Sequence, residues 1–280
     1  MAKTILVDGV EIEYTEIGSG PPIVFVHGVY VTGALWQDVA DRLSRNYRCI
    51  LPTWPFGAQR NPAGPGVDLG VAAAGSRILR FIEALDLSQV TLVANDTGGG
   101  IVLAALGNSA HDFGRVAAMV FTNCDSFDHF PPPGFLPLVK LCRLNAAIGR
   151  GILRMLASRP GLNYFASSVT RHGIDVTRRP AIFGGFATSA QVRREAVRLT
   201  AEIDPKHTLA ATAALETYPN PVLILWGAAD KLFPVEDAHR LANAFPHAAL
   251  RTIEDSSTYV MLDQPDDAAQ AIREFLTSIA

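Results

Sequence analysis

One stretch of ten residues carries most of the architectural information: Val90-Thr91-Leu92-Val93-Ala94-Asn95-Asp96-Thr97-Gly98-Gly99. Its first half is an apolar run too short for a helix, which is typical of a strand buried on both faces of a parallel sheet. Small residues then surround Asp96 and open a helix, so the backbone can turn sharply and push the Asp96 side chain out above the sheet. A carboxylate placed there can attack an electrophilic carbon. It can equally cap the following helix, and these ten residues leave both interpretations open.

Similar apolar runs lie on both sides of this stretch, with helical patterns between them. The predicted strands are Thr4–Val7, Val10–Ile17, Ile23–Val26, Arg48–Leu51, Val90–Ala94, Val116–Phe121 and Val222–Trp226. The predicted helices are Leu35–Leu43, Val71–Leu85, Ile101–Leu106, Val235–Phe245 and Pro265–Ile279. Strands that alternate with helices predict an α/β fold, with a mostly parallel sheet flanked by helices.

The alternation stops between residues 125 and 219, where helical patterns continue without a convincing strand. A plain loop of roughly 90 residues does not fit a compact domain. We therefore predict a core made of residues 1–124 and 220–280, and a helical lid, or cap, made of residues 125–219. Because strands precede and follow the lid, it should cover the carboxyl edge of the sheet, where α/β proteins bind ligands.

The predicted lid is strongly basic. Eleven Lys and Arg residues and two acidic residues lie between Leu136 and Thr200, in a chain whose net charge is −3. This excess can attract an anionic substrate or a carrier with phosphates. It is also explained by arginines that coat the solvent side of lid helices while their stems cover apolar surface. The second explanation requires no ligand, and we favour it at this point.

Composition restricts the classes of function. The 280 residues are 49% hydrophobic and 18% charged, which indicates a packed core. The near-neutral charge argues against a dedicated nucleic-acid binder, and no apolar run approaches the roughly 18 residues that span a bilayer. The N-terminus lacks a signal-peptide pattern, and three unpaired cysteines favour reduced thiols. We expect a cytoplasmic monomer or homodimer that acts on a small molecule, without nucleic-acid or membrane partners, metal or organic cofactor.

Two further turns belong to the same predicted edge of the sheet. His27-Gly28 follows a buried strand, so the N–H of the next residue, Val29, should face the same side as Asp96. Together with the N–H of Thr97 it would offer two donors to an oxyanion or a substrate oxygen. Asp230 follows a later strand, at the expected place of a triad acid, although its neighbours are also ordinary turn residues.

The order of these features resembles the α/β-hydrolase fold over nearly the whole chain. An aspartate at the centre of the turn is similar to the branch that contains haloalkane dehalogenases, fluoroacetate dehalogenases and epoxide hydrolases. In that branch the aspartate attacks carbon, and a histidine-activated water hydrolyses the resulting ester. The resemblance implies that Asp96 is the nucleophile and Asp230 the triad acid. Asp125, which follows the preceding strand, is a second candidate for the acid.

The chain departs from this family at the histidine. The family histidine precedes an aromatic residue after the last strand, and here Thr258 stands before Tyr259. A threonine hydroxyl cannot serve as a general base near neutral pH. Two other histidines, His129 and His207 at the two ends of the lid, are candidates to reach the pocket. The halide-holding residues of haloalkane dehalogenases are also absent, since Val29 and Thr97 occupy their positions.

We expect a mostly apolar pocket between lid and core. Its predicted walls are Phe127, Phe130, Phe135 and Leu138 from the lid and Trp54 from the core, with the phenylalanines equally suited to anchoring the lid. The resemblance to epoxide hydrolases implies a lid tyrosine that protonates the epoxide oxygen. Tyr164 and Tyr218 are the candidates, with core packing as the alternative role.

Three functions are compatible with these residues. The first is a hydrolase in which Asp96 attacks an epoxide or a related electrophile, with Asp230, His129 or His207 helping water reach the ester. The second is a non-hydrolytic enzyme, a lyase, cyclase or decarboxylase, in which Asp96 acts as acid or base. The third is a binding protein that has lost the chemistry. Because Asp96, Asp230 and the oxyanion turn are all present, we expect an enzyme, and a hydrolase first.

Overall fold

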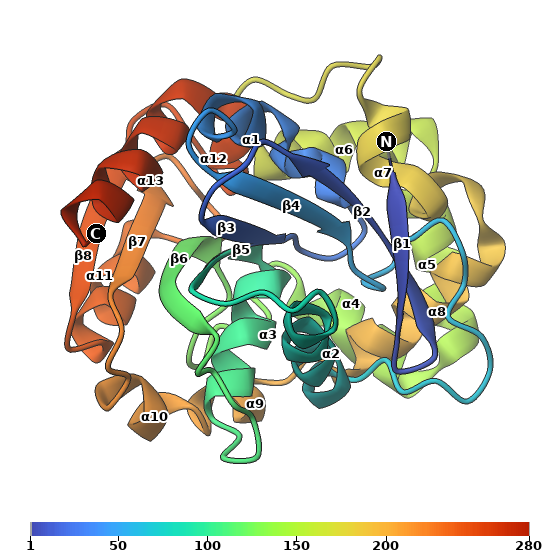
Figure 1. Cartoon of the computed structure of the whole chain (residues 1–280). Helices are drawn as coiled ribbons and strands as arrows, with labels where there is room; N and C mark the ends of the chain where they lie inside the picture. Colours follow the sequence, from blue (N-terminus) through green and yellow to red (C-terminus); the bar gives the residue numbers. More distant parts are fainter. Residues whose placement is uncertain (1, 280) are drawn as a thin grey trace.

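One sheet of eight strands forms the core of the molecule. A computed structural model describes residues 2–279, and Figure 1 shows the strands β1 (Lys3–Val7), β2 (Val10–Ile17), β3 (Pro22–Val26), β4 (Arg48–Thr53), β5 (Val90–Asp96), β6 (Val116–Cys124), β7 (Val222–Gly227) and β8 (Ala248–Ile253). Their order is β1-β2-β4-β3-β5-β6-β7-β8. The pairs β1–β2 and β2–β4 are antiparallel, and the other five are parallel. The predicted mostly parallel sheet is confirmed.

Helices cover both faces of this sheet, as the alternating pattern predicts. They are η1 (Gly33–Trp36), α1 (Gln37–Leu43), α2 (Val71–Ala84), α3 (Thr97–Leu106), α11 (Val235–Ala244), α12 (Val260–Asp263) and α13 (Pro265–Ser278). Helices α1 and α13 pack together on one face, and α2 and α3 pack together on the other. In α2 the buried residues Val71, Ala74 and Ile78 are three and four positions apart, so one stripe of the helix faces the sheet.

Strand β8 is absent from the sequence prediction. It lies at the edge of the sheet and pairs only with β7. Its residues alternate between half-buried and exposed, and Ile253 is the single buried one. An edge strand of this kind lacks the continuous apolar run by which the central strands are recognised, and this is why it was missed.

The chain between β6 and β7 is helical. Its helices are α4 (Leu136–Leu144), α5 (Ala146–Leu156), α6 (Arg159–Val169), α7 (Arg179–Thr188), α8 (Ala190–Glu202), α9 (Pro205–Leu209) and α10 (Thr212–Glu216). Helix α5 packs against α4, α6 and α8. We refer to residues 125–219 as the helical insertion. Neither here nor in the core does any helix within residues 2–279 combine the length and apolar character needed to cross a membrane.

One buried carboxylate ties the helical insertion to the core. Asp263 accepts hydrogen bonds from the backbone N–H of Arg171, just after α6, at 2.9 Å, and from that of Ser257 at 2.9 Å. Close by, the N–H of Tyr259 donates to the carbonyl of Val169 at 2.9 Å. These bonds hold the carboxyl end of α6 against the loop that precedes α12.

Candidate active site

Asp96 stands at a sharp turn between β5 and α3. Its φ of 53° and ψ of −137° lie in a region that side-chain-bearing residues rarely occupy, and such strain is concentrated at functional sites. The carboxylate makes no capping hydrogen bond to α3. The helix-cap interpretation that the sequence left open is therefore wrong. The Asp96 side chain is instead directed out above the sheet, as a nucleophile elbow requires.

Two glycines make the approach of neighbouring turns to Asp96 possible. A Cβ on Gly28 would overlap the Oδ2 atom of Asp96, and a Cβ on Gly98 would overlap the carbonyl oxygen of His27. The Asp96 carboxylate therefore lies directly against the backbone of Gly28. This contact places the His27-Gly28 turn and the following residue, Val29, beside the carboxylate.

Replacing Gly28 with alanine is expected to displace the Asp96 carboxylate. A shift of about 1 Å at a reacting group lowers rates by on the order of 100-fold, so we expect an electrophile such as an alkyl epoxide to alkylate Asp96 slower by about that factor. The matched control is Gly151→Ala in α5, because a Cβ there meets nothing within 4 Å. Thermal unfolding of both variants shows whether they are folded. An unchanged alkylation rate in a folded Gly28→Ala variant would contradict this account.

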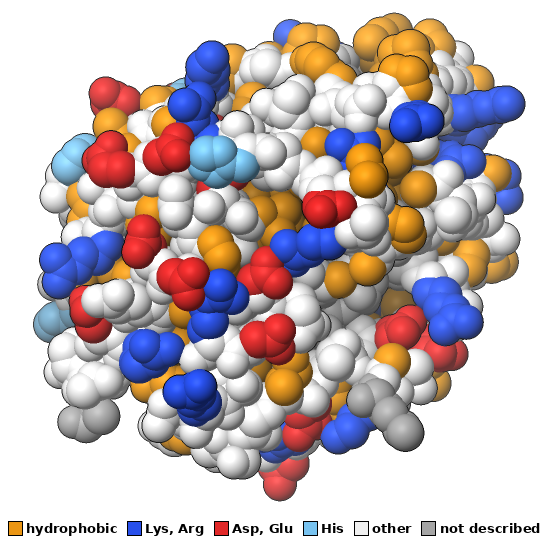
Figure 2. All heavy atoms as spheres, turned by 90° about the horizontal axis from the view of Figure 1, so that it is seen from above, with side chains coloured by type: hydrophobic (Ala, Val, Ile, Leu, Met, Phe, Trp, Pro, Cys, Tyr) orange, Lys and Arg blue, Asp and Glu red, His pale blue; other side chains and the backbone are white. Residues whose placement is uncertain are grey.

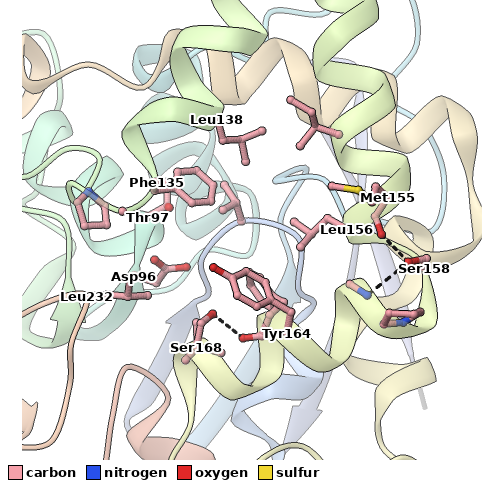
Figure 3. Close-up of a pocket in the computed structure, with 18 residues that line it drawn as sticks. Asp96, Thr97, Phe135, Leu138, Met155, Leu156, Ser158, Tyr164, Ser168 and Leu232 are labelled. Carbon is pink, nitrogen blue, oxygen red and sulfur yellow. Dashed lines mark hydrogen bonds between the residues drawn. The ribbon is translucent and has the colours of Figure 1, made fainter.

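Asp96 opens into a cavity of about 510 Å³ between the sheet edge and the helical insertion. Figure 3 shows its mostly apolar walls. They include Val29, Thr97, Phe135, Leu138, Ile152, Met155, Leu156, Tyr164, Phe165, Val169 and Leu232. This volume and lining suit a small organic ligand. Val29 and Thr97 from the core, and Phe135 and Leu138 from the insertion, lie where the sequence predicts them.

Three aromatic residues expected in the cavity wall lie elsewhere. Trp54 is buried in the core, where its Nε1–H donates to the carbonyl of Phe25 at 3.0 Å. Phe127 packs under Arg240, whose guanidinium carbon is 4.1 Å from the ring centroid. Phe130 is fully buried. Phe127 and Phe130 follow β6 too closely to reach over the sheet edge, and they anchor the insertion instead.

The two histidines considered as substitute bases also lie away from the cavity. The Nδ1 atom of His129 is 2.9 Å from the Asp237 carboxylate on α11, which draws this ring away from Asp96. His207 is half-buried on α9, against the edge of Phe130. No histidine lines the cavity within residues 2–279. The expectation that His129 contacts the substrate is therefore wrong.

His27 has a structural role in the turn that carries Val29. Its Nε2 accepts a hydrogen bond from the backbone N–H of Trp54 at 2.9 Å, so its Nδ1–H donates to the carbonyl of Gly28 at 2.8 Å. Burial lowers the pKa of His27 to about 4. The ring is consequently neutral under ordinary conditions, and it fixes the turn rather than exchanging protons.

Thr258 and Asp230 are in direct contact. The hydroxyl of Thr258 donates to Oδ2 of Asp230 at 2.9 Å, and the amide of Asn123 donates to the same oxygen at 2.8 Å. On the other side, the Nδ2 amide of Asn95, the residue before Asp96, donates to the carbonyl of Thr258 at 2.8 Å. Thr258 therefore bridges the carboxylate after β7 and the turn at Asp96. The sequence did not single out Asn95 and Asn123, since neither amide is part of the family motif.

The sequence of this chain is similar to those of known proteins over most of its length. Residues 23–271 match the model of the alpha/beta hydrolase family. The chain belongs to this family. It is 26% identical over 275 residues to haloalkane dehalogenase 2 of Mycobacterium bovis, covering 94% of this chain and 90% of that relative. It is 26% identical over 286 residues to cis-3-alkyl-4-alkyloxetan-2-one decarboxylase of Shewanella oneidensis, covering 96% and 86%.

A solved structure adds to the likeness in fold. The crystal structure of haloalkane dehalogenase DbeA from Bradyrhizobium elkani USDA94 superposes with a TM-score of 0.83 at 16% identity, covering 100% of this chain and 98% of that one. At this identity the likeness shows the fold alone. The family match and the dehalogenase relative support the assignment of this α/β hydrolase as a hydrolase enzyme.

The carboxyl groups of this α/β hydrolase are electrostatically linked. Burial raises the pKa of Asp96 to about 7; the backbone N–H of Thr97 acts against this shift, and the charge of Asp230 adds to it. Asp125, at the end of β6, is 1% exposed, and its Oδ1 atom has no hydrogen-bond partner. Burial, followed by the charge of Asp96, raises the pKa of Asp125 well above its ordinary value. Both effects favour the protonated form of Asp125.

Proposed function

We propose that Asp96 is a nucleophile that attacks an electrophilic carbon of a small, largely apolar molecule, such as an epoxide, and that the resulting ester is hydrolysed. One observation carries the proposal: the strained Asp96 carboxylate is free of helix-capping bonds and opens into an apolar cavity of about 510 Å³. A carboxylate that is poorly solvated is a stronger nucleophile than one in water. The dehalogenase relative also supports attack on carbon.

Tyr164 supplies the proton that ring opening of an epoxide requires. It is the tyrosine of the cavity wall, and Figure 3 shows its side chain extending from α6 into the cavity on the side of Asp96. Tyr218, the other candidate, is buried against Phe245 and belongs to the core. Attack of Asp96 on carbon breaks the ring C–O bond, and the leaving oxygen takes the phenol proton.

Hydrolysis of the ester is the step for which this site is poorly equipped. The N–H groups of Val29 and Thr97, which line the cavity beside Asp96, polarise the ester carbonyl. The water has no imidazole to activate it, because Thr258 occupies the place beside Asp230. We therefore expect the ester to form faster than it breaks down and to accumulate.

The same lack of a histidine favours a second candidate function that needs no water. The Shewanella oneidensis relative is named as a decarboxylase of an oxetan-2-one, a strained cyclic ester. Attack of Asp96 on the saturated ring carbon bonded to the ring oxygen would break that C–O bond and release a carboxylate. The carboxylate then leaves as CO₂, and the electron pair of the broken C–C bond forms a C=C bond. The C–O bond to Asp96 breaks in the same step. The Asp96 carboxylate is thereby regenerated without hydrolysis.

Intact-mass spectrometry of the protein tests both functions. Incubation with an alkyl epoxide is expected to add the mass of the whole epoxide to the wild type and nothing to Asp96→Asn. Because Asp96 must be ionised, the adduct should form roughly tenfold faster at about pH 8 than at about pH 6. An alkyl-substituted oxetan-2-one that yields alkene and CO₂ without an adduct supports the second function. Tight binding of apolar ligands with neither outcome would mean that the protein is a receptor.

A further inference from the structure

The surface around α5 lacks acidic residues. No Asp or Glu occurs in the sequence from His129 to Ile174, whereas this segment contains the basic residues Lys140, Arg143, Arg150, Arg154, Arg159 and Arg171. In Figure 2 an area without acidic side chains lies at the upper right, where hydrophobic and basic side chains gather. The basic excess of the helical insertion is therefore concentrated on one part of the surface, together with apolar groups.

Helix α5 presents two parallel stripes of side chains. Ile148, Ile152 and Met155 are spaced by four and three residues, so they lie along one side of the helix. Arg150 and Arg154, four residues apart and both exposed, lie along the other side. Gly151 lies between the two stripes and faces outward, since a Cβ added to this residue would meet no atom within 4 Å. This arrangement of apolar and basic stripes is typical of helices that lie in a membrane interface.

The apolar stripe is continuous with the cavity above Asp96. Ile152 and Met155 both line that cavity, and Met155 is also 68% exposed. Tyr164 on α6 combines the same two properties. Of the eight large hydrophobic side chains that are exposed within residues 2–279, four lie between residues 144 and 164. The cavity therefore opens to solvent through an apolar rim.

Most basic residues of this surface have no acidic partners. Within residues 2–279, Lys140, Arg150, Arg154 and Arg159 take part in no ion pair, and Arg143 pairs with Asp204 at the margin. Burial and the neighbouring charge of Arg154 lower the pKa of Arg193 on α8. Positively charged side chains therefore lie near one another without acidic partners. The resulting positive potential attracts anions.

We propose that α5, with the adjoining ends of α4 and α6, docks on the surface of an anionic lipid bilayer and turns the cavity mouth towards the acyl chains. The apolar rim would enter the interface, and Arg150, Arg154 and Arg159 would meet lipid phosphates. A second copy of this chain fits the surface less well, because a symmetric contact would oppose like-charged arginines. The expectation of no membrane partner rested on the absence of a spanning run, which peripheral docking does not require.

Co-sedimentation with vesicles tests the docking without any substrate. The wild type is expected to bind phosphatidylcholine vesicles with about 30 mol % phosphatidylglycerol far better than pure phosphatidylcholine vesicles, and to be released by about 0.5 M NaCl. Each basic side chain at such a surface contributes about fivefold to partitioning, so Arg150→Glu/Arg154→Glu should lose at least about 25-fold. Ile148→Ser/Met155→Ser should also lose binding. Asp96→Asn should bind like the wild type, which separates this proposal from the proposed chemistry.

Matched variants keep the result specific to this surface. Arg60→Glu/Arg251→Glu makes the same change in net charge at exposed positions outside the helical insertion, and Leu6→Ser removes an exposed apolar group on β1. Both should bind vesicles like the wild type. Equal binding to neutral and anionic vesicles, no binding at all, or equal losses in test and control variants would overturn the proposal. So would a dimer in sedimentation velocity that Ile148→Ser/Met155→Ser dissociates, since the surface would then be a subunit interface.

Discussion

Replacing Asp96 with asparagine is expected to abolish covalent modification and turnover, and to stabilise the fold at neutral and higher pH. Removal of a nucleophile that acts as part of a catalytic unit lowers rates by on the order of 10⁴-fold or more. Asparagine is nearly the same size as aspartate, so the cavity should keep its shape. Intact mass with an epoxide measures the first effect, and urea unfolding measures the second.

The expected gain in stability follows from the pKa of Asp96. Burial raises this pKa from 3.8 to about 7, so folding favours the protonated carboxyl. The protonated Asp96 carboxyl contributes its full stabilisation at pH values below the pKa that it has in the unfolded chain. This contribution is lost as the pH rises through about 7. The free energy of unfolding of the wild type should therefore fall by on the order of 4 kcal/mol over this range relative to Asp96→Asn.

The control for this pH dependence is Glu83→Gln, which neutralises an exposed carboxyl on α2. Its free energy of unfolding should follow that of the wild type across the same pH range. If Asp96→Asn and the wild type also run parallel, the carboxyl is solvated and lacks the dry environment on which its proposed reactivity depends.

Replacing Thr258 with histidine is expected to shorten the lifetime of the ester by on the order of 10²- to 10⁴-fold, the usual contribution of a general base. The Thr258 hydroxyl lies 2.9 Å from Oδ2 of Asp230, so an imidazole Nδ1–H at this position would find its acceptor already in place. Isolation of the adduct, followed by its decay in fresh buffer, measures the effect.

Two variants control the Thr258→His experiment. Thr258→Ser keeps a hydroxyl and should leave the lifetime of the ester unchanged. Thr258→His/Asp230→Asn should lose most of the gain, because the imidazole no longer has a charged partner. A folded Thr258→His protein whose ester decays no faster would show that position 258 does not face the ester. With an oxetan-2-one substrate, the same variant should divert alkene formation towards a hydrolysed product.

The central strands and the turn at Asp96 could be predicted because their signals are local. A continuous apolar run such as Val90–Ala94 specifies a buried strand, and the small residues around Asp96 permit the sharp turn. The edge strand β8 lacks such a run and was missed. The contact between Thr258 and Asp230 joins the turns that follow β8 and β7, and the sequence indicated these two positions only through the resemblance to the family.

The walls of the cavity could not be predicted in the same way. Phe135 and Leu138 line it, but Phe127 and Phe130, only a few residues earlier, are buried beside the sheet. Which side of a short connecting segment faces a cavity depends on packing against distant elements, such as Arg240 against Phe127. The contribution of α5 and α6, including Met155, likewise depends on how the helices of the insertion pack on one another.

The hydrogen bonds around Asp263 restrict which parts of the helical insertion can move relative to the core. Because Asp263 and Val169 clamp the carboxyl end of α6 to the loop before α12, that end is a fixed pivot. We therefore expect any widening of the cavity entrance to move the opposite end of α6, where Arg159 follows the turn from α5, and to leave the residues nearest to Thr258 in place. A ligand that enters in this way should leave the arrangement of the reacting groups unchanged.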